Sequence, residues 1–257
     1  MASLSIPDLA SKAVLVTGAS TGIGAALAIA YAAQGCRVGL HYNSSRTAAD
    51  DVVKTISDAG GEVFLVQGDF SRSADIERVV EETAKHFGRL DGLVNNAGGM
   101  LGRVPYAEMT DAQYDAVMDL NARSVITASR VAIPWLTKRG GFIVNTSSVA
   151  ARNGGGGGAG LYASSKAFVS NYTRGLSKEL IGSGIRVNAV APGLILTAFH
   201  ERWSNADQMK AMVAGIPQGR AGTAEDCVGA YLFLSSDLLS GYVTGQVIEV
   251  NGGSLMP

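Results

Sequence analysis

The segment Thr17-Gly-Ala-Ser-Thr-Gly-Ile-Gly24 follows a short apolar run, Ala13–Val16, and opens a stretch in which apolar residues recur at helical spacing. A glycine-rich turn between a buried strand and a helix is typical of a dinucleotide-binding unit. In such a turn Gly18 permits the tight bend, Gly22 lets the backbone approach a pyrophosphate, and Gly24 lets the helix pack closely on the strand. The helix then presents free N–H groups and its positive dipole end to phosphate. Taken alone, the turn is also compatible with a plain connection between two elements.

Seven short runs rich in Val, Ile and Leu predict the strands that accompany this turn. They are Ala13–Val16, Val38–Tyr42, Val63–Val66, Gly92–Val94, Phe142–Asn145, Arg186–Val190 and Val247–Val250. Between them, apolar residues recur at helical spacing, as at Ile76, Val79 and Val80. Strands that are apolar throughout are buried on both faces, which means a parallel sheet covered by helices on either side. We therefore expect an α/β fold, a doubly wound Rossmann sheet of seven parallel strands in a single domain spanning residues 1–257.

Composition and charge exclude several other classes of protein. Lys and Arg total 21 against 22 Asp and Glu, a net charge of −1 without a basic block, so neither nucleic acid nor a membrane is expected as a partner. The uncharged run Ala13–Cys36 is long enough to span a membrane, but the glycine turn in its middle argues against that. Cys36 and Cys227 are expected to be buried packing residues in a reduced, cytoplasmic setting.

Four further segments, polar or containing glycine, follow the carboxyl ends of predicted strands. They are Asn95-Asn96-Ala97-Gly98, Ser147-Ser148, the helix segment Tyr162-Ala-Ser-Ser-Lys166, and Pro192-Gly193. The carboxyl ends of parallel strands meet at one edge of a sheet, and that edge is where open α/β sheets bind their ligands. We therefore expect these segments and the glycine turn to converge on one crevice.

Tyr162 and Lys166 carry the clearest indication of chemistry. They are four residues apart, so on a helix both side chains project from the same face. An ammonium group near a phenol favours the phenolate and lowers a pKa that starts near 10, as a proton donor or acceptor at neutral pH requires. The alternative is an ordinary surface pair, but this helix starts at the predicted ligand edge.

These motifs, in this order and spacing, resemble the short-chain dehydrogenases/reductases of the TGxxxGxG and YxxxK form along the whole chain, and among them 3-oxoacyl reductases and sugar or polyol dehydrogenases. The resemblance implies that Tyr162 donates a proton to the substrate oxygen on reduction and accepts it on oxidation. Lys166 would bind the nicotinamide ribose and lower the pKa of Tyr162. Ser148 would hydrogen-bond the substrate oxygen, and Asn121 would hold a water that links Lys166 to solvent.

The resemblance also implies a set of cofactor contacts. Asp69 is expected near the adenine amino group, Asn95, Ala97 and Gly98 beside the adenine ribose, and Ile195 with Thr197 at the carboxamide of the nicotinamide. The complete expected set is Gly18, Ser20, Gly22, Ile23, Gly24, Asn43, Ser44, Arg46, Asp69, Asn95, Ala97, Gly98, Tyr162, Lys166, Pro192, Gly193, Ile195 and Thr197.

The end of the second predicted strand indicates which cofactor is used. Enzymes selective for NAD place Asp or Glu there, where it accepts hydrogen bonds from the ribose 2′-hydroxyl. Here that position is Tyr42, and Asn43, Ser44 and Arg46 follow as donors that suit a 2′-phosphate, together with Ser20 of the glycine turn. We expect a preference for NADP(H), with NAD(H) as the second candidate.

Two departures from the family pattern concern the substrate side. Ser148 precedes Tyr162 by 14 residues, one more than is common in the family, and Ser147 is the alternative to Ser148. The additional residue is expected in the run Gly154–Gly158, a predicted mobile loop that leaves the size of the substrate open.

The histidines give no metal-ligand spacing, and no metal is expected. His41 and His86 are interpreted as structural. His200 is a candidate substrate contact, and Phe199 and Trp203 share that ambiguity with packing as the favoured role.

The predicted function is an NAD(P)(H)-dependent oxidoreductase that interconverts a ketone and a secondary alcohol of small-molecule size. A cofactor-binding sensor or scaffold without turnover is the alternative, and an epimerase or dehydratase of the related larger fold is the second. A homotetramer is expected, because Thr244–Gly252 resembles the family's last strand at a subunit interface. The predicted helices from about Asp111 and about Leu161 would supply the other interface. The identity of the substrate and the direction of the reaction stay open.

Overall fold

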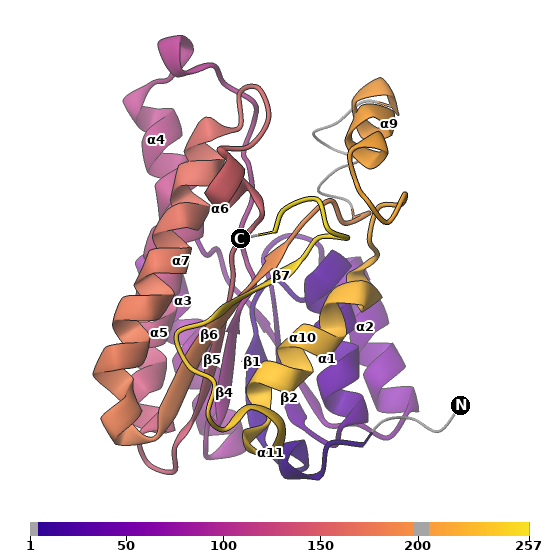
Figure 1. The fold of residues 1–257 in the computed structure, drawn as a ribbon. Coiled ribbons are helices and arrows are strands. Elements are labelled where there is room, and N and C mark those ends of the chain that lie inside the picture. The colour runs from indigo at the N-terminus through magenta and orange to yellow at the C-terminus, as the bar shows by residue number, and fades with distance from the viewer. Residues whose placement is uncertain (1–4, 198–205, 257) are drawn as a thin grey trace.

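A parallel sheet of seven strands forms the centre of the computed structural model, which describes residues 5–197 and 206–256 (Figure 1). The strands are β1 (Ala13–Val16), β2 (Arg37–Tyr42), β3 (Val63–Gln67), β4 (Gly92–Asn95), β5 (Gly141–Thr146), β6 (Ile185–Pro192) and β7 (Val247–Val250). They lie in the order β3-β2-β1-β4-β5-β6-β7. The order reverses between β1 and β4, and such a switch point is where an open parallel sheet forms its ligand crevice.

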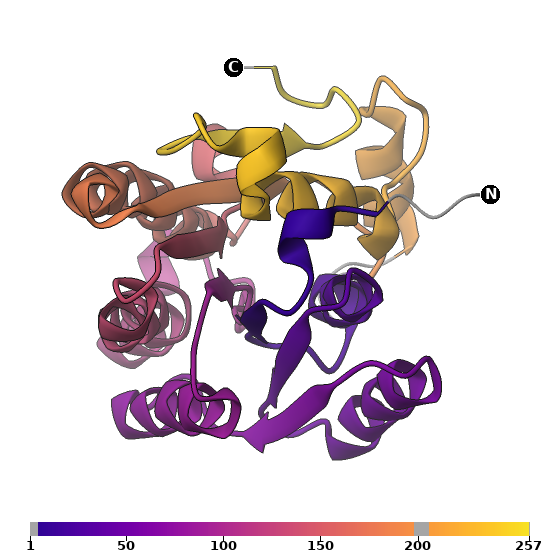
Figure 2. The ribbon, with the colours of Figure 1, turned by 90° about the horizontal axis from the view of Figure 1, so that it is seen from below.

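Helices cover both faces of the sheet, as the view in Figure 2 shows. They are α1 (Gly22–Ala33), α2 (Arg46–Asp58), α3 (Ser73–Phe87), α4 (Asp111–Met118), α5 (Ser124–Leu136), α6 (Ala150–Asn153), α7 (Gly160–Leu180), α9 (Ala206–Ala214), α10 (Ala224–Ser235) and α11 (Asp237–Ser240). Helices α1, α2 and α10 pack on one face, and α3, α5 and α7 pack on the other. Within the described residues, no helix is both long and apolar enough to cross a membrane.

The two faces of the sheet bury separate apolar clusters, which explains why the strands are apolar throughout. In β5, Phe142 and Val144 pack with α1 and α10, whereas Ile143 between them packs with α5 and α7. Successive side chains of a strand point to opposite faces, so a strand covered on both sides needs apolar residues at every position. The predicted doubly wound Rossmann sheet is confirmed, and the strand boundaries differ from the predicted ones by at most two residues.

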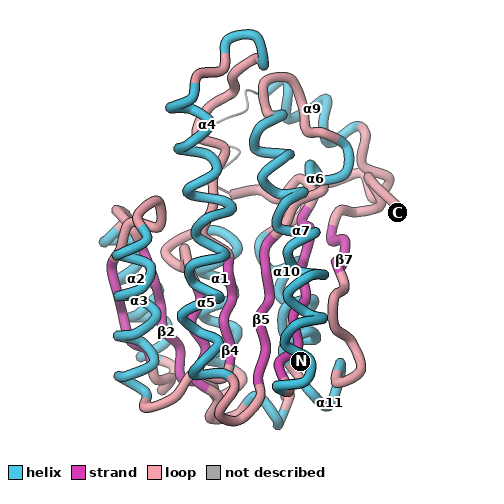
Figure 3. Tube along the Cα trace, turned by 90° about the vertical axis from the view of Figure 1, so that its left-hand side faces the viewer, coloured by secondary structure: helices cyan, strands magenta, loops and turns pink. Residues whose placement is uncertain are grey.

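Two connections differ from the sequence-based expectation. The helix expected from about Asp111 is divided by a π-helical turn, Asp119–Arg123, so that α4 and α5 follow one another along one column (Figure 3). The glycine run does not lead directly from a strand into a helix, because the short helix α6 precedes it. The run is held by backbone hydrogen bonds, among them one from the N–H of Val104 to the carbonyl of Gly158 at 2.9 Å.

Candidate active site

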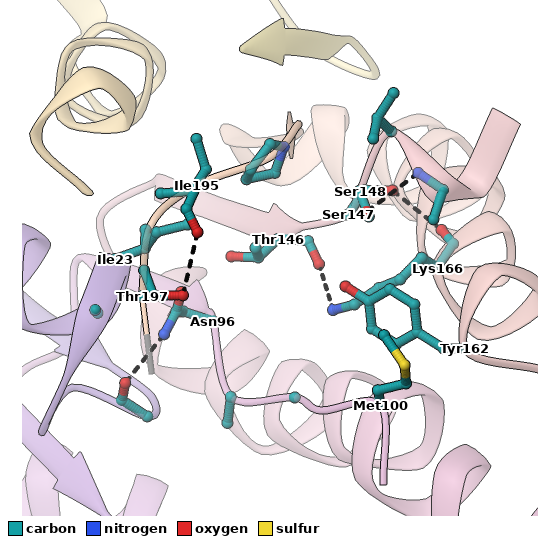
Figure 4. Close-up of a pocket in the computed structure, with 18 of the residues that line it drawn as sticks. Ile23, Asn96, Met100, Thr146, Ser147, Ser148, Tyr162, Lys166, Ile195 and Thr197 are labelled. Carbon is teal, nitrogen blue, oxygen red and sulfur yellow. Dashed lines mark hydrogen bonds between the residues drawn. The ribbon is translucent and has the colours of Figure 1, made fainter. Parts of the chain in front are cut away.

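A cavity of about 690 Å³ opens at the carboxyl edge of the sheet. Its wall consists of the loops that follow β1, β2, β3, β4, β5 and β6, together with residues of α7 and of the segments near Met212 and Ser254. Figure 4 shows the side chains from these segments turned toward the common space. The prediction that separate segments converge on one crevice is confirmed.

The glycine turn after β1 forms a tight cradle on one side of this cavity. Gly18 has a positive φ of 64° and a Cβ there would lie 2.9 Å from the Cα of Ala97, so the position tolerates no side chain. A Cβ on Gly24 would overlap the carbonyl oxygen of Gly18. Thr21, the residue that precedes α1, makes no side-chain hydrogen bond to the helix, so the first N–H groups of α1 are not capped by it. These features fit the pyrophosphate of a dinucleotide.

Asn96 holds the cradle in place, a role that sequence reasoning missed. Its amide Nδ2 donates to the carbonyl oxygens of Thr17 and Gly18 at 2.9 and 3.1 Å (Figure 4). Its backbone N–H and that of Ala97 both donate to Oγ1 of Thr17 at 2.9 Å. The loop after β4 is therefore bonded to the turn after β1, which fixes two walls of the cavity relative to one another.

Tyr162, Lys166 and Ser148 lie together on the other side of the cavity (Figure 4). The side chain of Ser148 lies close enough to the phenol of Tyr162 to lower its pKa. The ammonium Nζ of Lys166 donates to the carbonyl of Thr146 at 2.8 Å and lies 5.9 Å from the centroid of the Tyr162 ring. One helical turn of α7 thus presents both side chains to the cavity, as their spacing predicted.

Ser147 points away from the reacting groups. Its hydroxyl donates to the backbone carbonyl of Lys166 at 3.1 Å and lies 2.6 Å from the hydroxyl of Ser170. Its hydroxyl therefore anchors the strand end to α7. Because Ser148 is the neighbour of Tyr162, the geometry favours Ser148 over the alternative Ser147 as the substrate-binding hydroxyl.

Burial shifts the pKa values of Tyr162 and Lys166. Desolvation raises the pKa of Tyr162, although the hydrogen bond with Ser148 acts in the opposite direction. Desolvation also lowers the pKa of Lys166 to about 8. The expected lowering of the Tyr162 pKa is therefore not found in the protein alone, because removing the phenol from water outweighs the stabilisation of its anion.

Asn121 lies in the π-helical turn, buried beneath the cavity wall. Its Nδ2 donates to the carbonyls of Gly99 and Val117 at 2.8 and 2.9 Å, and its Oδ1 accepts from the N–H of Gly99 at 3.0 Å. A Cβ on Gly98 would lie 2.7 Å from Oδ1 of Asn121 and 3.1 Å from Nζ of Lys166. Asn121 and Lys166 therefore both lie next to Gly98, and the π-helical turn places the Asn121 side chain there.

Most of the expected cofactor residues line the cavity. The lining includes Gly18, Ser20, Gly22, Ile23, Gly24, Asn43, Ser44, Ala97, Gly98, Tyr162, Lys166, Pro192, Gly193, Ile195 and Thr197. Arg46, Asp69 and Asn95 do not belong to it.

The positions of Arg46 and Asn95 have simple physical causes. Nε of Arg46 donates to both carboxylate oxygens of Asp50, each at 2.9 Å, because the two residues are one turn apart on α2. Nη1 of Arg46 reaches the hydroxyl of Tyr42 at 3.3 Å. Asn95 ends β4 with its side chain buried, and its Nδ2 donates to Oδ1 of Asn145 in the neighbouring strand at 2.8 Å. Neither side chain lines the cavity, and their roles as cofactor contacts stay predictions.

Asp69 has a local role in the turn after β3. Its Oδ1 accepts hydrogen bonds from the N–H and the hydroxyl of Ser71 at 2.9 and 2.8 Å. The next residue, Phe70, lines the cavity in its place. His200, Phe199 and Trp203 lie outside the described residues, and among the described ones no group of three or more His, Cys, Asp and Glu side chains is placed to hold a metal ion.

A dinucleotide cradle at the switch point of a parallel sheet, in one cavity with Tyr162, Lys166 and Ser148, defines the class of nicotinamide-dependent oxidoreductases. The family described as Enoyl-(Acyl carrier protein) reductase matches residues 18–254. The chain is 39% identical over 249 residues to a 3-oxoacyl-[acyl-carrier-protein] reductase of Synechocystis sp., covering 96% of this chain and 98% of that protein. The chain belongs to the short-chain dehydrogenase/reductase family.

Solved structures agree with this assignment. The NADH-dependent reductase A1-R′ responsible for alginate metabolism superimposes with a TM-score of 0.89 at 38% identity, covering 98% of this chain and 100% of that one. A short-chain dehydrogenase from Burkholderia cenocepacia J2315, solved in complex with NADP, superimposes with a TM-score of 0.88 at 33% identity, covering 96% of this chain and 99% of that one. Both nicotinamide cofactors are therefore found among structures similar to this chain.

Proposed function

We propose that this oxidoreductase interconverts a small ketone and its secondary alcohol with NADP(H) as the preferred cofactor and with Asn121, Ser148, Tyr162 and Lys166 as its catalytic set. The observation that carries the proposal is that Tyr162, Lys166 and Ser148 line one cavity with the glycine cradle. A sensor or scaffold that only binds cofactor has no need of these three side chains. The buried free thiols of Cys36 and Cys227 support the proposed cytoplasmic setting.

Each residue of the proposed catalytic set has a separate role in the reaction. The cofactor supplies the hydride when bound, and the protein supplies orientation and a proton. Ser148 holds the substrate oxygen beside the hydroxyl of Tyr162, and Tyr162 gives its proton to that oxygen in reduction and takes it back in oxidation. Lys166, fixed by the carbonyl of Thr146, positions its ammonium at the base of the site. Asn121, fixed by three backbone hydrogen bonds, flanks Lys166 and suits the proposed water-holding role.

A substrate panel tests the proposed reaction. The absorbance of the reduced nicotinamide is followed with ketones and alcohols of three classes, namely 3-oxoacyl thioesters, sugars or polyols, and steroid-like ketones, each with NADPH or NADP⁺ and NADH or NAD⁺. Turnover of at least one class is the expected result. Tight cofactor binding without turnover of any would favour the sensor instead.

Cofactor preference is expected to follow the loop after β2. Ser20, Asn43 and Ser44 line the cavity and can donate to a 2′-phosphate, and a hydrogen bond to a charged group contributes about 1.5–3 kcal/mol, or about 10- to 150-fold. Because Asp50 engages Arg46, we expect the lower end, about tenfold, in kcat/KM for NADPH over NADH. In Tyr42→Asp, the new carboxylate should remove this preference.

Tyr42→Phe is the matched control, since it keeps the ring and removes only the hydroxyl that contacts Arg46. Its preference should stay within about twofold of the wild type. A wild-type preference for NADH, or an unchanged preference in Tyr42→Asp, would contradict the assignment.

A homotetramer is the proposed assembly. The exposed large apolar side chains include Leu238, Leu239 and Tyr242 in the segment before β7, and Ile126 and Phe168 on α5 and α7. Apolar surface of this kind is typical of an interface. Sedimentation at micromolar concentration should give four times the chain mass of 26.5 kDa, and a single-chain mass would exclude the assembly.

A further inference from the structure

His41 lies near the end of β2 and joins two loops that line the cavity. Its Nδ1 accepts a hydrogen bond from the backbone N–H of Gly18 at 3.0 Å, and its Nε2 donates to the carbonyl of Gly68 at 3.0 Å. The ring stacks on Phe70 with centroids 3.9 Å apart. The imidazole, only 1% exposed, therefore bridges the turn after β1 and the loop after β3.

The two hydrogen bonds require a neutral imidazole of one tautomer. An N–H can only donate and a carbonyl can only accept, so Nδ1 must carry the lone pair and Nε2 the proton. Burial lowers the pKa of His41 to about 4, which keeps the ring neutral at physiological pH. Arg78 acts in the same direction, and the nearby carboxylates of Asp69 and Asp75 act in the opposite one.

We propose that His41 is a positioning residue for the cofactor, setting the distance between the phosphate-binding turn and the adenine side of the cavity. Gly18 begins the cradle, and Phe70 forms part of the cavity wall. Through its two hydrogen bonds and its stacking contact, His41 fixes both at once. This inference rests on the proposed function, because it assumes a dinucleotide in the cavity.

The partners of His41 all belong to the nucleotide side of the site. Its hydrogen bonds and its ring contact go to the loops after β1 and β3, whereas Tyr162 and Ser148 come from α7 and the end of β5. A change at His41 should therefore alter the binding of cofactor and leave the chemical step intact. This separates a positioning role from a catalytic one.

Three substitutions separate the two hydrogen bonds. His41→Asn places an amide oxygen where Nδ1 stands and can keep the bond to Gly18, whereas His41→Gln can reach Gly68 and loses Gly18. His41→Phe keeps the stacking on Phe70 and loses both bonds. The Kd of NADPH is measured by fluorescence titration of the protein without substrate, alongside thermal unfolding and, where a substrate is known, cofactor KM and kcat.

The expected Kd of NADPH rises about tenfold or more in His41→Phe and by less in His41→Asn, while kcat at saturating cofactor stays within about twofold. His86→Phe is the matched control, because His86 also stacks on a phenylalanine, Phe64 at 4.1 Å, but is exposed on α3 outside the cavity. Its Kd should not change. If His41→Phe does not fold, the His41→Asn and His41→Gln variants, which each keep one bond, provide the test. The Kd of NADPH should then be higher in these variants than in the wild type.

A Kd within twofold of the wild type in the folded His41 variants would overturn the inference, as would a loss of kcat at unchanged cofactor KM. Failure of the proposed function has a different signature, which is read from the wild-type protein: it would bind neither NADPH nor NADH in the same titration, or it would bind cofactor and turn over no substrate of the panel.

Discussion

Replacing Tyr162 with Phe is expected to lower kcat by about 10²- to 10⁴-fold, the usual contribution of a positioned acid or base. The substitution removes the hydroxyl that faces the cavity beside Ser148 and changes little volume. The Kd of the cofactor should stay within a few-fold of the wild type, because the glycine cradle is untouched. Steady-state kinetics on a substrate from the panel, with a fluorescence titration of the cofactor, measures both quantities.

Tyr172→Phe is the matched control on the same helix. Tyr172 does not line the cavity, so removing its hydroxyl should leave kcat within about twofold of the wild type. If Tyr162→Phe keeps more than about a tenth of the wild-type kcat, Tyr162 is not the proton donor. If both variants lose activity equally, the loss reflects damage to α7 and not to the chemistry.

The fold could be predicted because its determinants are local and repeated. Strands such as β5, buried on both faces, leave an uninterrupted apolar run in the sequence, and a dinucleotide cradle needs glycines at fixed positions. The spacing of Tyr162 and Lys166 is likewise local, since a helix turns 3.6 residues at a time. These features hold whatever the rest of the chain does.

At the site, sequence reasoning is least able to place neighbouring residues of similar chemistry that take different directions. Asn95 and Asn96 are neighbouring residues of the same type. The side chain of Asn95, at the end of β4, bonds to Asn145 within the sheet, whereas the side chain of Asn96 bonds to the glycine cradle. Arg46 has a carboxylate one helical turn away, and that pair formed in preference to an orientation toward the cavity. Such choices depend on the exact end of a strand or helix, which periodicity does not define.

His41 illustrates a different limit of sequence reasoning. A histidine inside an apolar strand reads as a packing residue, and it is indeed buried. Its two hydrogen-bond partners, Gly18 and Gly68, are backbone groups 23 and 27 residues away. Backbone partners leave no side-chain signature, so only the structure brings them to light.

Gly24 is expected to be the most sensitive position of the cofactor cradle. An added Cβ would overlap the carbonyl oxygen of Gly18 and lie 2.6 Å from Nδ2 of Asn96, and neither group can retreat, because they are bonded to each other. Overpacking of this kind costs about 1–3 kcal/mol, which the protein relieves by opening the turn. Gly24→Ala should therefore raise the Kd of NADPH by about 10- to 100-fold, measured by titration, and lower the unfolding temperature.

Gly182→Ala is the matched control for the added methyl group. Gly182 lies in the turn Ile181–Ser183, its φ is not positive, and a Cβ there meets nothing within 4 Å. The substitution should leave the Kd of NADPH unchanged and shift stability by no more than about 1 kcal/mol, in the stabilising direction, because Ala restricts the unfolded chain. If the Gly24→Ala protein binds NADPH as tightly as the Gly182→Ala protein, cofactor binding does not need the close approach of α1 to the turn. The phosphate-binding cradle would then have to be assigned elsewhere in the cavity.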